Sequence, residues 1–558
     1  MQRLSKPPTS RAARIVACCM TAIFGAACPT GVYTPPAPPA APAAAPPLVV
    51  DTAAMDAHLK YLADDLLEGR APATRGGELA ARYIATTFQA LGLTGAGSDG
   101  SYYQPVSLVG LTPRPTFVWG GRGATALRYL DDFVAWAQRP DSNIVADGDV
   151  VFVGYGIAAP EWQWDDYKDM DVRGKVLLML VNDPGLQDST VFNGKALAYY
   201  GRWTYKLEEA TRRGAVGVVM IHTAASATYP WEVVRSSWSV EQFMIEGDAA
   251  GDLAFGSWVT EDAARRALGA RRLNLDSLTA AAARRDFKPV ATGIHVAVTV
   301  SSALRHVRSS NVVAKLTGSD TALAREVVVL TAHYDHKGIG PAVNGDSIYN
   351  GAEDNASGVA ALLGAAEALV RAPRPKRSLL FIATTAEESG LLGSQAYVSA
   401  PLVPLARTAA ALNIDVANVH GATRDIASLG MERSSLGQAF AAAARAESLT
   451  ATGDPDPTKG SFFRSDHFPF ARAGVPSLSI ETGVNFVGRP ASWGREEADR
   501  YTEQRYHQPS DEYSAAFTYQ GMAQQVRVMV RLAVAVANAP ALPSWLPSSE
   551  FQRGRTAP

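Results

Sequence analysis

The sequence predicts an α/β fold in which a mixed, mostly parallel β-sheet is flanked by helices. Short apolar runs rich in β-branched residues are typical of buried strands, and segments with Ala and Leu at helical spacing lie between them. Alternation of this kind favours a sheet covered by helices. The strand-like runs occupy 327–330, 378–385, 410–418 and 475–483, and the helical patterns occupy 355–370, 390–398, 435–447 and 519–537.

Residues 131–289 differ from this pattern and predict a β-rich insert. Short strand-like runs at 150–156, 175–181 and 215–222 are joined by loops rich in aromatic residues, Gly and Pro. No cluster of ligand-type residues stands in this stretch, so we expect it to bind, cover or orient a substrate rather than to catalyse. The expected order begins with a leader (1–28) and a Pro/Ala-rich tether (29–50). A catalytic domain in two segments (51–130 and 290–540) follows, with the insert (131–289) between them and a tail (541–558) after them.

The amino terminus resembles a signal peptide. Basic residues within 6–14 precede an apolar run at 15–27, which is too short to be expected to span a membrane. Residues 25–28, Gly-Ala-Ala-Cys, resemble a bacterial lipobox, although Gly25 stands where a large aliphatic residue is usual. We expect export, either as a periplasmic or outer-membrane lipoprotein held through lipidated Cys28 or as a secreted protein released by signal peptidase. A single-pass anchor is the weaker alternative.

The composition is that of an ordinary globular protein and excludes some classes. With 54 acidic against 52 basic residues and no basic stripe, the chain shows no sign of a nucleic-acid partner. All three cysteines (Cys18, Cys19 and Cys28) lie in the leader, so we expect no disulfide to hold the fold together.

Ligand-type side chains follow the first strand-like run of the catalytic domain. His333, Asp335 and His336 come just after this run, and Asp354 precedes a helical pattern. Functional sites of open α/β sheets form at the carboxyl ends of the strands, which is where these residues are expected. A solvated loop would explain this stretch if it stood by itself.

Further acids follow the later strand-like runs. Glu387 and Glu388 come directly after 378–385, and adjacent residues there point in different directions, so one can bind a metal while the other moves protons. Asp415 lies within an apolar run, where an unpaired carboxylate is costly and a charged partner or metal is expected. His507 adds an imidazole from a later loop.

Six motifs, in this order, resemble those of the zinc aminopeptidase family that also contains glutamate carboxypeptidase II: AHYDH, GAEDNASG, TAEESGLLGS, NIDV, SDHFPF and YHQPSDEY. The resemblance extends over about 51–537 and is densest over 327–511. It implies a catalytic sheet of the zinc-aminopeptidase type. Two segments of the insert, GKVLLMLVNDPG and KLEEATRRGAVGVVMIH, resemble a protease-associated domain, a non-catalytic module of several exported peptidases.

The resemblance also implies a site for two Zn²⁺ ions. The implied ligands, carried over motif by motif, are His333 and Asp415 for one ion, Glu388 and His507 for the other, and Asp354 between them. Glu387 would be the general base toward a metal-bridged hydroxide and later the general acid. Asp335 would orient His333, and Tyr506 would donate to the oxyanion. His336 and His467 are expected outside this ligand set.

The implied activity is that of an aminopeptidase acting on peptide substrates. A carboxypeptidase of the glutamate-carboxypeptidase type is the alternative, and it requires basic residues for the substrate carboxylate, for which the sequence offers Arg464 and Arg489. A glutaminyl cyclase, which typically uses one zinc, and a non-catalytic binding protein are less favoured because the ligand set is complete.

Overall fold

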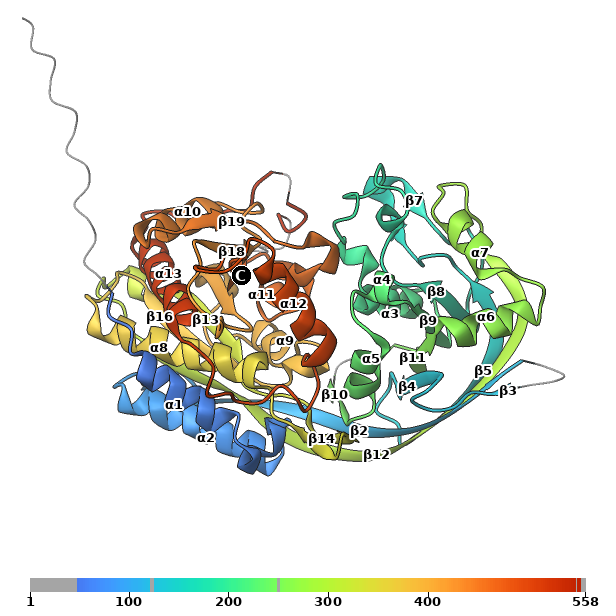
Figure 1. The fold of residues 1–558 in the computed structure, drawn as a ribbon, viewed down its shortest axis with the longest axis horizontal. Coiled ribbons are helices and arrows are strands. Elements are labelled where there is room, and N and C mark those ends of the chain that lie inside the picture. Colours follow the sequence, from blue (N-terminus) through green and yellow to red (C-terminus); the bar gives the residue numbers. More distant parts are fainter. Residues whose placement is uncertain (1–47, 121–124, 248–250, 548, 553–558) are drawn as a thin grey trace, which may run out of the picture. The chain divides into compact units, whose positions relative to one another are not determined.

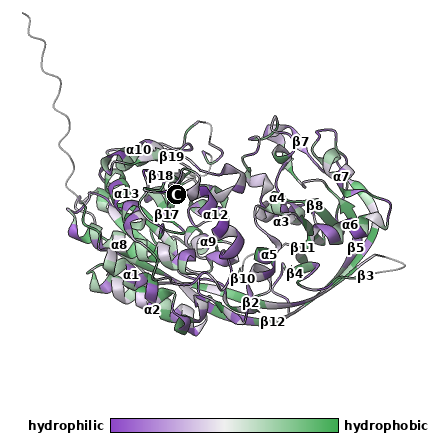
Figure 2. Cartoon of the chain, viewed as in Figure 1, coloured by the Kyte–Doolittle hydropathy of each residue, from purple (hydrophilic) through white to green (hydrophobic). Residues whose placement is uncertain are grey.

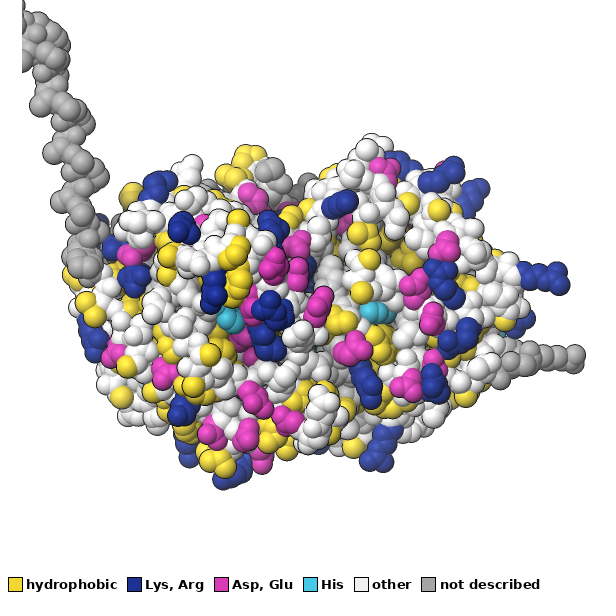
Figure 3. All heavy atoms as spheres, viewed as in Figure 1, with side chains coloured by type: hydrophobic (Ala, Val, Ile, Leu, Met, Phe, Trp, Pro, Cys, Tyr) yellow, Lys and Arg dark blue, Asp and Glu magenta, His cyan; other side chains and the backbone are white. Residues whose placement is uncertain are grey.

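A computed structural model of the chain describes residues 48–120, 125–247, 251–547 and 549–552. The predicted leader and most of the predicted tether therefore lie outside the described residues. No helix among the described residues is long and apolar enough to cross a membrane. On the face drawn in Figure 3, basic and acidic side chains are interspersed. The absence of a nucleic-acid partner stays a prediction.

Four parallel strands form the centre of the catalytic sheet. They are β20 (Ser477–Thr482), β17 (Thr408–Ile414), β13 (Val327–His333) and β16 (Ser378–Thr384), which pair in that order. Every residue of β13, β16 and β17 is buried, as expected for parallel strands covered on both faces. Continuous apolar runs in the sequence therefore mark these strands correctly, and the predicted α/β class is confirmed (Figure 1).

Helices cover both faces of these strands, and alternate strand residues pack against each layer. Val328 and Leu330 lie in the larger core cluster, with the helices α1, α2, α8, α10 and α13, whereas Val327 and Val329 face α9 and α11. In Figure 2, α8 is mostly hydrophobic. The helices are α1 (Thr52–Leu62), α2 (Arg75–Ala90), α8 (Gly358–Arg371), α9 (Leu392–Ser399), α10 (Leu436–Ala446), α11 (His467–Arg472), α12 (Trp493–Gln504) and α13 (Gln520–Asn538).

Two long strands extend this sheet into the insert. β2 (Tyr103–Trp119) and β12 (Val290–Leu316) pair antiparallel, and β12 also pairs with β16 on the catalytic side and with β5 (Asn143–Phe152) on the other. The sheet then continues through strands with their own apolar clusters, in the order β8 (Val176–Leu180), β9 (Gly217–His222), β11 (Phe255–Thr260) and β4 (Phe133–Ala137). The sequence predicted a separate module here and did not predict one continuous sheet.

Shorter elements complete the described part of the chain. On the catalytic side, β18 (Asp425–Leu429) and β19 (Thr450–Thr452) extend the sheet beyond β20, and β14 (Gly338–Val343) pairs with β15 (Asp346–Tyr349). In the described part of the insert, the short helix α4 (Ala224–Ala227) and four longer helices flank the strands, and the strand β10 (Gln242–Ile245) pairs with β2. The four longer helices are α3 (Trp203–Arg212), α5 (Trp231–Trp238), α6 (Glu261–Gly269) and α7 (Leu275–Ala282).

Candidate metal centre

The predicted ligands converge at the carboxyl ends of the central parallel strands. His333 ends β13, the two glutamates follow β16, and Asp415 directly follows β17. Asp354 lies between β15 and α8, and His507 follows α12. Because the carboxyl ends of parallel strands meet at one edge of a sheet, residues far apart in the sequence become neighbours there.

One group of donors surrounds the imidazole of His333. Its Nε2 atom lies 3.2 Å from Oδ1 of Asp354 and 3.1 Å from Oδ1 of Asp415. One ligand atom from each of the three residues lies within 4.8 Å of the others. Zinc–ligand bonds of 2.0–2.1 Å in a tetrahedron place neighbouring ligand atoms about 3.3–3.4 Å apart, so the spacing fits a zinc ion.

A second group shares Asp354. Nε2 of His507 lies 3.4 Å from Oδ2 of Asp354 and 3.0 Å from Oε2 of Glu388. This Nε2 atom is buried and is faced by these two carboxylate oxygens, an environment that suits a cation bound between them. The two oxygens of Asp354 therefore face the two different imidazoles, as a bridging ligand must.

His336 lies closer to this second group than the sequence predicted. Its Nδ1 atom is 2.5 Å from Oε1 of Glu388, and one ligand atom each from His336, Asp354 and Glu388 lies within 4.8 Å of the others. The ring is buried, and its Nε2 atom has no hydrogen-bond partner among the described residues. The 2.5 Å contact is the length of a hydrogen bond, shorter than the 3.0 and 3.4 Å between His507 and the same carboxylates, so His336 contacts the ligand group through Glu388.

Asp335 is fully buried and holds the turn that carries the glutamates. Its carboxylate accepts the backbone N–H groups of Glu387 and Glu388, at 3.1 and 3.4 Å. The Nδ1 atom of His333 is 3.2 Å from the backbone carbonyl oxygen of Asp335 but 4.0 Å from its carboxylate. The contact of Asp335 with His333 is therefore a hydrogen bond to its main-chain oxygen.

Two further residues that sequence reasoning did not single out position the loop of Asp354. Asp511 accepts the N–H of Glu353 at 2.9 Å and that of Asp354 at 3.0 Å. Burial, followed by the negative charge of Glu353, raises the pKa of Asp511 to about 8. Asp511 falls within the YHQPSDEY motif, and this position in the motif is the signal in the sequence that could have identified it.

Arg70 is the second such residue, and it ties the first helices to the candidate site. It is completely buried, and its guanidinium donates only to main-chain carbonyl oxygens: those of Tyr334 at 2.8 Å, Gly351 at 3.0 Å, and Leu62 and Asn350 at 2.5 Å each. Tyr334 directly follows the candidate ligand His333, and Gly351 lies three residues before Asp354. Arg70 has no local signal in the sequence that reveals these long-range partners.

The adjacent glutamates have opposite pKa shifts. Burial, the largest effect, raises the pKa of Glu387 well above its ordinary value. Burial also acts to raise the pKa of Glu388, but the charges of His507, Lys337 and His336 outweigh it and hold that pKa well below its ordinary value. Neighbouring carboxyl groups whose pKa values are pushed apart are suited to different tasks, one as a ligand and one as a proton carrier.

Tyr506 lies against the second donor group. Its ring centroid is 3.8 Å from that of His507. Burial and the negative charges of Asp354 and Glu388 raise the pKa of Tyr506 well above its ordinary value. The phenol therefore stays protonated and can donate a hydrogen bond into the cavities that it lines.

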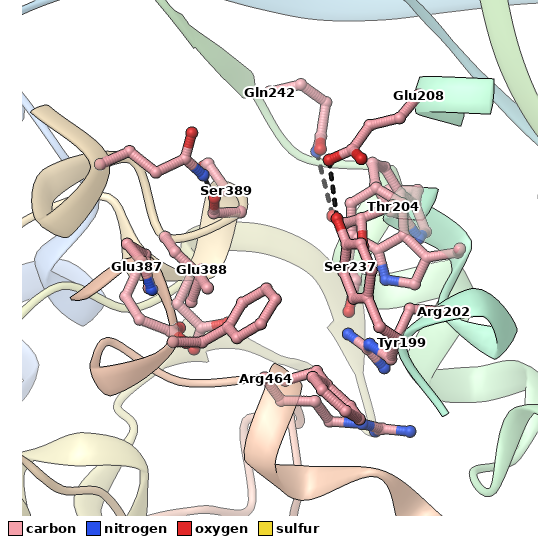
Figure 4. Close-up of a pocket in the computed structure, with 18 of the residues that line it drawn as sticks. Tyr199, Arg202, Thr204, Glu208, Ser237, Gln242, Glu387, Glu388, Ser389 and Arg464 are labelled. Atoms are coloured by element: carbon pink, nitrogen blue, oxygen red, sulfur yellow. Dashed lines mark hydrogen bonds between the residues drawn. The ribbon is translucent and has the colours of Figure 1, made fainter. Parts of the chain in front are cut away.

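A cavity of about 480 Å³ opens beside the candidate metal centre (Figure 4). Glu387, Glu388 and His507 line one side of it, and the insert supplies the other side, including Arg202 and Ser237. A second cavity of about 190 Å³ is lined by Asp354, Asp415, Glu387 and Glu481. The insert is therefore part of the wall of the candidate site.

Two arginines, Arg202 and Arg464, line the larger cavity and have no acidic partner among the described residues. Arg202, from the insert, is buried, and its Nε atom has no hydrogen-bond partner in the described part of the chain. Burial and the charge of Arg464 lower the pKa of Arg202 to about 9. Arg464 donates to Oγ1 of Thr228 at 2.9 Å, and among the described residues neither arginine forms an ion pair with a carboxylate. Arg489, the other basic residue considered from the sequence, instead lies over the ring of Trp493 and lines a different cavity.

The imidazoles and carboxylates that converge at the end of the parallel sheet are the donor types of a candidate metal centre. Residues 311–533 match the model of peptidase family M28, in keeping with the ordered motifs of the sequence. The resemblance to this family of peptidases that the motifs indicate is thereby confirmed over residues 311–533.

Curated relatives match part of the chain. Aminopeptidase YwaD of Bacillus subtilis is 32% identical over 195 residues, which is 33% of this chain and 36% of that protein. The probable lipoprotein aminopeptidase LpqL of Mycobacterium tuberculosis is 29% identical over 238 residues, 38% of this chain and 43% of that protein. The chain thus spans less than half the length of these relatives.

A solved structure shares the fold over most of the chain. The aminopeptidase from Aneurinibacillus sp. strain AM-1 superposes with a TM-score of 0.51 and 20% identity, covering 88% of this chain and 95% of the other. At this identity the likeness concerns the fold. It supports a mixed α/β sheet flanked by helices as the architecture of the chain.

Proposed function

We propose that the chain is an exported di-zinc aminopeptidase that removes amino-terminal residues from peptides. The observation that carries this proposal is the carboxylate of Asp354, whose Oδ1 lies 3.2 Å from His333 and whose Oδ2 lies 3.4 Å from His507. One bridging carboxylate between two imidazoles suits a pair of divalent cations. Asp415 and Glu388 complete the two ligand groups, and Glu388 is also within reach of His336.

Two bound zinc ions would supply Lewis acidity for the scissile carbonyl and for the attacking water. Glu387 would take the proton of that water, a role supported by its Oε2 atom, which lies 3.9 Å from Nε2 of His333 and so faces the donor group at more than ligand spacing. The same carboxyl group then delivers a proton to the leaving amine. Tyr506 donates its hydroxyl hydrogen to the oxyanion of the tetrahedral intermediate.

A second candidate function is supported by Arg202 and Arg464. Two guanidinium groups without acidic partners, facing the cavity beside Glu387, are suited to bind a substrate carboxylate. That chemistry is what a carboxypeptidase, or an aminopeptidase of very short peptides, requires. The insert would then act as a specificity module, in keeping with its resemblance to a protease-associated domain.

Export is supported by the basic and apolar leader and by the name of the relative LpqL. Mass spectrometry of the mature amino terminus tests it. A diacylated Cys28 supports the lipoprotein, and an unmodified terminus further along the chain supports release by signal peptidase. A terminus that begins at Met1 would contradict export by either route.

The activity is tested with a substrate panel and a metal count. The purified protein is expected to contain two zinc ions per chain and to hydrolyse aminoacyl arylamides, with activity lost on chelation and restored by zinc. Amino-terminal acetylation of a peptide should abolish cleavage by an aminopeptidase, whereas a carboxypeptidase would still cut it. Full activity without any divalent metal would refute both candidates.

A further inference from the structure

The insert touches the candidate metal centre directly through one hydroxyl group. Oγ of Ser237, on helix α5 of the insert, lies 2.8 Å from Nδ1 of His507. The other ring nitrogen, Nε2, faces Asp354 and Glu388 at 3.4 and 3.0 Å. The imidazole is therefore held between a serine from one segment of the chain and the metal-binding carboxylates from another.

We propose that Ser237 is a positioning residue for the metal centre, fixing the orientation and tautomer of His507; this rests on the proposed function. An imidazole that binds zinc through Nε2 carries its hydrogen on Nδ1, and it then needs an acceptor for that hydrogen. Ser237 Oγ stands at hydrogen-bond distance from that nitrogen. Outer partners of this kind commonly influence metal affinity by about 10–100-fold.

The backbone of His507 shows why such support is needed. His507 has φ = 54°, in the left-handed region that residues with a β-carbon adopt less readily. Unfavourable backbone conformations persist where the surroundings over-determine them. The contact with Ser237 on one side and with the carboxylates on the other supplies that constraint.

Helix α5 is itself well anchored, so that its hydroxyl can act as a fixed point. The ring of Trp238 stacks on that of Trp136 with centroids 3.7 Å apart, and Val234 is fully buried. The side chain of Gln242 donates to the backbone oxygen of Ser237 at 3.0 Å (Figure 4). The position of α5 therefore fixes the position of the His507 imidazole. A displacement of α5 is expected to lower the zinc affinity of the site to which His507 contributes.

The test is zinc affinity, measured on the full chain by competition with a chromogenic chelator. Ser237→Ala is expected to weaken one of the two zinc equivalents by about 10–100-fold. Ser237→Thr, which keeps the hydroxyl, is expected to restore affinity to within a few-fold of the wild type. Ser239→Ala is the matched control, because among the described residues the Ser239 hydroxyl donates to the backbone oxygen of Ser236, at 3.4 Å, and not to a candidate ligand, so affinity should not change.

The outcomes separate this proposal from the proposed function. A wild type with two zinc ions and an alanine variant of equal affinity would overturn the role of Ser237 and leave the peptidase intact. Weakened binding that threonine does not restore would assign the effect to packing and likewise overturn it. A wild type that binds no zinc would instead refute the proposed function. Circular dichroism of each metal-free variant confirms that loss of affinity is not loss of the fold.

Discussion

Replacing Glu387 by Gln should abolish most turnover while leaving the metal content unchanged. In the structure, Oε2 of Glu387 is 3.9 Å from Nε2 of His333, whereas the expected ligand atoms of Asp354 and Asp415 approach the same nitrogen to 3.2 and 3.1 Å. The amide has nearly the shape of the carboxylate. The backbone N–H of residue 387 would still donate to Asp335, so the turn should persist.

The amide cannot accept the proton of the attacking water. General acid–base catalysis contributes about 10²–10⁴-fold, so the barrier for kcat should rise by about 2.7–5.4 kcal/mol. The assay compares kcat on an aminoacyl arylamide with the zinc content of the same preparation. Glu388→Gln is the matched control, expected to lower zinc content because Glu388 is 3.0 Å from Nε2 of His507. Turnover within threefold of the wild type, at full zinc content, would falsify the assignment of Glu387 as the base.

Three further changes probe other parts of the structure. Chelation should lower thermal stability because it leaves the carboxylates of Asp354 and Glu388 close together. Zinc at about 100 times its Kd should restore about 2.7 kcal/mol for each site that it fills, and equal melting curves with and without zinc would contradict this. Arg70→Met should lower the free energy of unfolding by about 3–5 kcal/mol in denaturant titrations, since it removes the donor for four buried carbonyls, and a loss under 1 kcal/mol would be inconsistent with that role. Arg202→Leu should raise KM about 10–100-fold for peptides with a free carboxylate but not for the corresponding peptide amides. The control Arg489→Leu should leave KM unchanged for both kinds of substrate. An equal effect of Arg202→Leu on both kinds would rule out carboxylate binding.

The sequence by itself determined the central strands and most of the residues at the candidate centre. Val327–His333 and Ser378–Thr384 are continuous apolar runs because parallel strands are buried on both faces, so the pattern is written locally in the chain. Ligand-type residues could be identified because they stand directly after these apolar runs, at the ends of the strands. The ordered motifs then implied their roles.

Only the tertiary structure decided which distant groups meet. The pairing of β2 with β12, the contact of Ser237 with His507, and the approach of Arg202 to the cavity join residues separated by many positions in the chain. An isolated serine or arginine in the insert has no periodicity or spacing that signals its partner. These contacts arise from how the insert packs against the catalytic sheet, and packing depends on the whole folded chain rather than on any one segment.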